Sequence, residues 1–98
     1  MNETTFYIGI NIKTPDGFDS IGKFYIGNNR EAAYALFKQL EGNKDMSESS
    51  MLTMELLETV GTLPLNLQLI SCSLEKLGCN CRLITKEVFK LRNLEDAG

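Results

Sequence analysis

The stretch SLEKLGCNCRLITKEVFKL, residues Ser73–Leu91, decides the fold of this chain. Its apolar residues recur at alternating intervals of three and four positions, and they are Leu74, Leu77, Cys81, Ile84, Val88 and Leu91. This spacing predicts one apolar stripe along an α-helix. We expect Ser73 to be the N-cap, because its hydroxyl can accept a hydrogen bond from an otherwise unpaired backbone N–H. Such a helix needs an apolar sheet face to pack against.

A second interpretation of this stretch ends the helix at Gly78. The segment 81–91 would then form a fifth strand, because it contains the β-branched residues Ile84, Thr85 and Val88. The regular helical spacing favours the helix.

The N-terminal residues predict a β-hairpin. Apolar side chains alternate with other residues over 6–13, which is typical of a strand with one face in the core. The sequence Thr-Pro-Asp-Gly at 14–17 favours a turn, since proline fixes φ and glycine tolerates positive φ. A second, antiparallel strand is expected at 19–27. Its inward side chains would be Phe24 and Ile26, and its outward side chains Ile21 and Tyr25.

A first helix is expected to follow over Asn29–Glu41. Asn28 and Glu31 are spaced as a capping box. The expected buried face consists of Ala33, Leu36, Phe37 and Leu40. We expect Gly42 to end the helix with a positive φ.

Residues 51–60 have a composition that suits a helix, yet Leu52, Met54 and Leu56 alternate as in a strand. Leucines alternate again over 65–69, and a glycine-containing turn at 60–62 separates the two runs. This arrangement predicts a second hairpin.

The predicted order is ββαββα within a single α+β domain, residues 1–98. Two ββα units, about 5–41 and 51–91, are joined by a polar loop at 42–50. We expect a two-layer sandwich with a four-stranded, mainly antiparallel sheet and both helices on one face. This order matches a circularly permuted ferredoxin-like fold, in which the second and fourth strands would be central.

The charge balance excludes some partners. The net charge is −3, the pI is about 4.9, and ten Lys and Arg residues are scattered among thirteen Asp and Glu residues. Nucleic-acid binding usually needs a basic stripe, and acidic membrane surfaces attract basic segments. The chain has no apolar run long enough for a membrane span, and MNETTFYIGIN lacks the basic start of a signal peptide. We therefore expect a cytoplasmic location and neither a nucleic-acid nor a membrane partner.

The residues typical of catalysis and metal binding are scarce. The chain has no histidine, which removes the commonest general base. Cys79 and Cys81 would point about 200° apart on a helix, so they are expected to remain reduced thiols without a metal, like Cys72. Glu55 and Glu58 should lie on opposite faces of a regular strand. The sequence thus predicts a non-enzymatic domain with no catalytic residue and no cofactor.

The outer face of the sheet is the candidate site. If the helices cover the face that bears Phe6, Ile8, Phe24 and Leu67, several apolar side chains remain outside. These candidate interface residues are Tyr7, Ile21, Tyr25, Leu57 and Ile70, together with Leu83 on the polar side of the last helix.

An exposed face of an antiparallel sheet is normally polar, so this cluster predicts a covered surface and a homo-oligomer or another protein partner. One alternative is that a β-bulge shifts the strand phase and places these residues in the core. Another is a small-ligand-binding domain with a pocket between the sheet and the helices.

The C-terminal half, CSLEKLGCNCRLITKEVFKLRNLE, resembles short uncharacterised bacterial proteins of about this length. The residues that carry the resemblance are Ser73, Leu74, Glu75, Leu77, Asn80, Cys81, Ile84, Thr85, Lys86, Glu87, Phe89, Lys90, Asn93 and Leu94. No activity is known for that family, so the resemblance implies no function.

Overall fold

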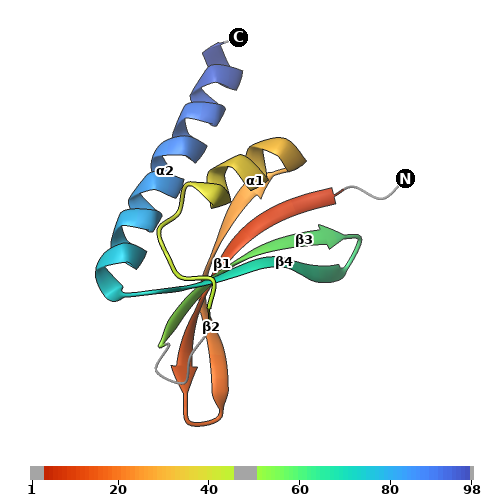
Figure 1. Cartoon of the computed structure of the whole chain (residues 1–98). Helices are drawn as coiled ribbons and strands as arrows, with labels where there is room; N and C mark the ends of the chain where they lie inside the picture. The colour runs from red at the N-terminus through yellow and green to blue at the C-terminus, as the bar shows by residue number, and fades with distance from the viewer. Residues whose placement is uncertain (1–3, 46–50, 98) are drawn as a thin grey trace.

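The computed structural model describes residues 4–45 and 51–97, with the side chains of the last helix described as far as Lys90. Two hairpins are each followed by a helix, which confirms the predicted ββαββα order and the α+β two-layer sandwich (Figure 1). The elements are β1 (Thr4–Thr14), β2 (Gly17–Gly27), α1 (Arg30–Lys38), β3 (Leu52–Val60), β4 (Leu63–Cys72) and α2 (Leu74–Ala97).

The four strands form one antiparallel sheet in the order β2-β1-β3-β4. The first strands of the two hairpins are central, so the predicted ferredoxin-like order, with the second and fourth strands central, is wrong. Burial explains the order, because β1 and β3 carry the side chains that are least exposed, Phe6, Ile8, Met54 and Leu56. The second strand of each hairpin, β2 or β4, is more exposed and lies at an edge of the sheet.

The edge strands carry residues that a central position would not tolerate well. Lys23 on β2 is exposed, and a charge discourages further strand pairing. Pro64 on β4 lacks an N–H, and proline within sheets is confined mainly to edges.

Three residues interrupt the regular strand pairing. Ile26 and Ile21 are extra residues of β2, since Phe6 pairs with Gly27 and Tyr7 with Tyr25, and a second register shift follows Ile10. Leu67 is the extra residue of β4, where Leu56 pairs with Gln68 and Leu57 with Asn66. A bulge of this kind reverses the phase of the side chains that follow it.

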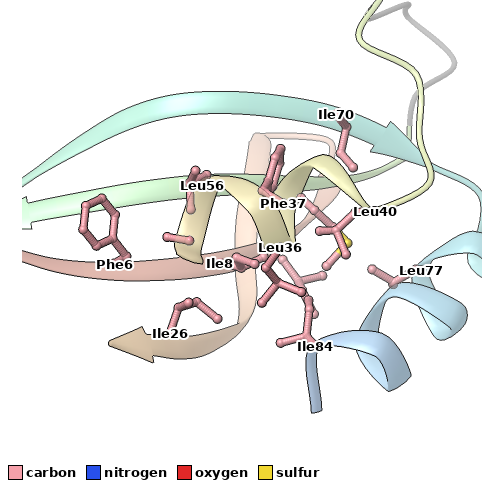
Figure 2. Close-up of a cluster of buried hydrophobic side chains, with 13 residues drawn as sticks. Phe6, Ile8, Ile26, Leu36, Phe37, Leu40, Leu56, Ile70, Leu77 and Ile84 are labelled. Carbon is pink, nitrogen blue, oxygen red and sulfur yellow. The ribbon is translucent and has the colours of Figure 1, made fainter. Parts of the chain in front are cut away.

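The core lies between one face of the sheet and both helices (Figure 2). Side chains from all four strands and both helices meet there, so both helices cover the same face. The buried apolar residues are Phe6, Ile8, Ile10, Ile26, Ala33, Leu36, Phe37, Leu40, Met54, Leu56, Ile70, Leu77 and Ile84. This set confirms the predicted buried face of α1 and the inward position of Ile26.

Helix α1 is shorter than predicted at both ends. Its N-cap is Asn29 rather than Asn28, and the Asn29 side chain accepts a hydrogen bond from the N–H of Ala32 at 3.0 Å. The helix ends at Lys38, and Leu36 and Phe37 carbonyls accept the next N–H groups in a tighter turn.

Gly42 does not have the positive φ that we expected, because the glycines with positive φ in the described part are Gly17, Gly27 and Gly61. Gly42 instead allows a close approach. A Cβ there would lie 2.8 Å from both the Cδ1 of Ile70 and the carbonyl oxygen of Ser71. The next residue, Asn43, exchanges two backbone hydrogen bonds with Ser71, at 2.9 and 2.8 Å. The predicted polar loop is therefore tied to β4 at its start, and its residues 46–50 lie outside the described part.

Helix α2 begins as predicted and runs without a break. The hydroxyl of Ser73 accepts a hydrogen bond from the N–H of Lys76 at 3.2 Å, which confirms the N-cap. The helix continues through Gly78, so the alternative of a fifth strand is wrong. Leu77 and Ile84 are buried, and Cys81 and Val88 pack against the core.

Leu74 is wrongly placed in the predicted stripe, because its side chain is 75% exposed. Leu74 is the first residue of α2 and, at 100° per residue, lies about 80° around the helix from Ile84. The side chain of Leu91, also expected in the stripe, lies outside the described part.

Asn80 is a buried polar residue on the covered face of α2. Its side-chain amide donates to the carbonyl oxygen of Glu41 at 2.8 Å, and its Oδ1 accepts from the N–H of the same residue at 2.8 Å. This pair of hydrogen bonds satisfies the buried amide and fixes the segment after α1 to the second turn of α2.

We predict that Ile84→Ala lowers the free energy of unfolding by roughly 2–5 kcal/mol, because it removes buried methyl groups and leaves a cavity. Chemical denaturation at low protein concentration measures the change. Leu74→Ala is the matched control on the same helix, and its effect should stay within about 0.5 kcal/mol. Equal stability of Ile84→Ala and the wild type would contradict the packing of α2 on the sheet.

Candidate functional site

The face of the sheet opposite the helices presents apolar side chains from all four strands. Strand pairing places Tyr25, Tyr7 and Leu57 side by side across β2, β1 and β3. The next row contains Gly9 and Glu55, and β4 adds Leu69 opposite Glu55. We define Tyr7, Tyr25, Leu57 and Leu69 as the open-face cluster.

The two tyrosines hold each other in a fixed arrangement. The ring centroids of Tyr7 and Tyr25 are 5.6 Å apart, and the rings meet edge to face at 60°. The ammonium of Lys23 lies 5.0 Å from the centroid of the Tyr7 ring. Edge-to-face pairs and cation–π contacts are both attractive, so these contacts help to hold the aromatic side chains of this face in place.

A polar network lies beside the aromatic pair. The carboxylate of Glu55 accepts a hydrogen bond from Asn11 at 3.2 Å and another from Asn66. The Asn11 amide also lies 3.4 Å from the hydroxyl of Thr53. Because both carboxylate oxygens have partners, the network gives the open face a polar patch of defined shape next to its apolar cluster.

Six candidate interface residues were predicted from the sequence. Three of them, Tyr7, Tyr25 and Leu57, lie on this face as expected. Tyr7 and Leu57 are partly exposed, and Tyr25 is 46% exposed. Ile21 is 56% exposed, but it is the extra residue of a bulge at the edge of the sheet and lies outside the open-face cluster.

The remaining two residues were assigned to the wrong environment. Ile70 is buried in the core opposite Met54, because the bulge at Leu67 reverses the phase of β4. The same reversal brings Leu69, which the sequence did not single out, to the open face. Leu83 is partly buried and packs against the core, at about 100° around α2 from Ile84.

The two glutamates of β3 lie on opposite faces, as predicted. Glu55 belongs to the open face, whereas Glu58 is buried on the helix side and forms an ion pair of 2.7 Å with Arg30 at the start of α1. The two carboxylates therefore do not form a pair of the kind that acid–base catalysis uses.

A hollow of about 470 Å³ lies on the helix side, between α1, the segment that follows it and β4. Its lining residues are Tyr34, Ala35, Lys38, Lys44 and Gln68. A smaller hollow of about 210 Å³ shares Lys44 and Gln68 and continues along β4. Lys38 and Lys44 supply positive charge, and none of the described residues that line these hollows is acidic.

The three cysteines are free thiols in different environments. Burial raises the pKa of the Cys72 thiol, although the hydrogen bond from Asn80 and the charge of Lys76 act in the opposite direction. Burial also raises the pKa of Cys81. Cys79 is exposed. Within residues 4–45 and 51–97, no three His, Cys, Asp or Glu side chains form a group that could hold a metal ion.

We predict that alkylation of the folded protein near neutral pH modifies Cys79 first, and Cys72 and Cys81 several-fold more slowly. A raised pKa keeps the two less exposed thiols protonated, and the thiolate is the reactive form. Mass spectrometry of a timed reaction with iodoacetamide measures the order, and in denaturant the three rates should converge. Faster modification of Cys72 than of Cys79 in the folded state would contradict the described environments.

The fold and this surface define a small α+β domain with an open-faced antiparallel sheet. No protein-family model, curated protein or solved structure matches the chain. In the described part of the chain, neither helix combines the length and apolar character that crossing a membrane requires.

Proposed function

We propose that this chain is a non-enzymatic, cytoplasmic interaction domain that self-associates through the open-face cluster. The observation that carries the proposal is the row Tyr25, Tyr7 and Leu57, which presents apolar surface on three neighbouring strands where no helix covers the sheet. Tyrosine suits such a surface because its ring is apolar and its hydroxyl can still meet water or a polar partner.

The charges of the open face favour a second copy as the partner. Lys23 and Glu55 lie on either side of Gly9 in one row across the strands. A two-fold axis parallel to β1 above Gly9 would place each lysine over the partner's Glu55. The same axis would place Tyr25 over the partner's Leu57. One symmetry operation therefore pairs opposite charges and also pairs apolar side chains.

Known interfaces and packed sheets define the size of the contact that this proposal requires. A stable protein interface buries about 800 Å² on each partner. Packed sheets lie about 10 Å apart, a distance that side chains of the size of tyrosine and leucine can fill.

We predict that Tyr25→Glu lowers the molar mass at a given concentration and weakens self-association at least about tenfold, or about 1.4 kcal/mol. A buried carboxylate without a partner opposes the contact. Size-exclusion chromatography with light scattering, over a concentration series, measures the effect.

The matched control for Tyr25→Glu is Leu63→Glu. Leu63 is 71% exposed, but it pairs with Val60 at the β3–β4 turn, away from the open-face cluster. The control should associate like the wild type. A wild-type chain that stays monomeric throughout the series, or a Tyr25→Glu variant that unfolds at low concentration, would refute the proposal.

The hollow beside α1 favours a second candidate function, the binding of a small organic anion. Lys38 and Lys44 supply positive charge from two separate segments, and Tyr34 and Gln68 supply an aromatic surface and a polar group. Pockets of several hundred Å³ with a few convergent polar groups are typical of small-molecule sites.

Phenyl phosphate is a suitable probe for this hollow, because it combines an anion with an aromatic ring. We predict shifts of the backbone amide signals of 34–38, 44 and 68 in an NMR titration. Lys38→Glu with Lys44→Glu should abolish these shifts, and Lys90→Glu, on the far helix, should leave them intact. Shifts scattered over the whole surface would count against the site.

A further inference from the structure

Helix α2 carries a second set of exposed residues that does not face the core. Leu74 is 75% exposed and Phe89 is 67% exposed. Gly78 and Thr85 lie between them and are also exposed. At 100° per residue these four positions fall within an arc of about 60°. We define Leu74, Gly78, Thr85 and Phe89 as the α2 flank.

The surface beside this flank is shallow and open to solvent. A hollow of about 460 Å³ is lined by Cys81, Arg82, Thr85, Lys86 and Phe89, all on α2. In Figure 1 this helix runs along one side of the molecule, with its later turns rising beyond the sheet. Leu74 and Phe89 therefore lie on an exposed side of α2.

The arrangement of the flank is symmetric along the helix. The four positions are separated by four, seven and four residues, with the large side chains at the ends and the small ones inside. A two-fold axis through the midpoint, between Cys81 and Arg82, would relate two antiparallel copies of α2. Leu74 would then meet the partner's Phe89, and Gly78 would meet the partner's Thr85.

Small residues at the centre allow two helices to approach closely, and the large residues at the ends then bury apolar surface at both ends. The whole stripe spans about 22 Å, at a rise of 1.5 Å per residue. Arg82 lies beside the axis, where its long side chain can run along the helices and keep its guanidinium in water.

The charges next to the flank match under the same operation. Glu75 and Lys86 lie on the same side of the flank, and the structure gives neither an ion pair within the described residues. The two-fold axis would bring Glu75 of one copy within about 3 Å, along the helix axis, of the partner's Lys86. Opposite charges therefore meet on both sides of the axis.

We propose that the α2 flank is a second self-association surface, on which α2 of another copy packs antiparallel. The occupant is a second copy because a single two-fold operation pairs both the apolar residues and the charges of the flank. Together with the open-face cluster, this surface would give the chain two isologous interfaces. Two such interfaces build an assembly larger than a dimer, a closed tetramer if their axes meet at right angles.

The test combines variants of the two surfaces. In sedimentation velocity at matched concentrations, Tyr25→Glu should leave dimers held by α2, and Tyr25→Glu with Phe89→Glu should give monomers. Gly78→Leu in the Tyr25→Glu background should also weaken the dimer at least tenfold, because it blocks close approach while favouring the helix. Lys76→Glu, which lies on α2 outside the flank, should have no effect.

Charge exchange provides an independent check. In the Tyr25→Glu background, Glu75→Lys or Lys86→Glu alone should weaken the dimer, and the two together should restore it. Circular dichroism confirms that each variant is folded.

The outcomes distinguish the two surfaces. A monomeric Tyr25→Glu single variant would overturn the α2 proposal and leave the open-face proposal standing. A mass that responds to Phe89→Glu but not to Tyr25→Glu would overturn the open-face proposal alone. A dimer that persists in Tyr25→Glu and does not respond to Phe89→Glu would also overturn the α2 proposal.

Discussion

The pairing of β1 with β3 is the interaction on which the rest of the structure depends. It is the contact that joins the two hairpins, and it aligns Ile8 with Leu56 and Ile10 with Met54 in the centre of the sheet. A lone two-stranded hairpin is at best marginally stable in water. Only after the two hairpins join does one continuous apolar face exist for α1 and α2 to cover.

The same pairing creates the surface for which we propose a function. Every residue pair that buries a side chain under the helices alternates with a pair that faces the other way. Tyr7 therefore lies beside Leu57, and Gly9 beside Glu55, on the face that the helices leave open. Both helices pack on the core side of the sheet. There the side chain of Asn80 donates a hydrogen bond to the carbonyl oxygen of Glu41 and so links α2 to the segment after α1. The open face is thus a consequence of the fold, and it is the surface that we propose another copy of the chain covers.

The sequence predicted the elements well and their arrangement less well. Alternation and caps identify hairpins and helices because both depend on neighbouring residues. Strand order depends on which hairpin strands pair, and both strands of each hairpin carry suitable apolar residues. The bulge at Leu67 has no local signal in a run of alternating leucines, so the sequence places Ile70 on the wrong face and does not single out Leu69. Asn80 was missed because it bonds backbone atoms 39 residues away.

The most direct test of the central claim is an isotope-filtered NOE experiment on a mixture of labelled and unlabelled chains, which reports only contacts between copies. Packing of the open face against a second copy predicts contacts between the Tyr25 ring protons and the methyl groups of the partner's Leu57. An associated protein that shows contacts between copies elsewhere but none from Tyr7, Tyr25, Leu57 or Leu69 would contradict the claim.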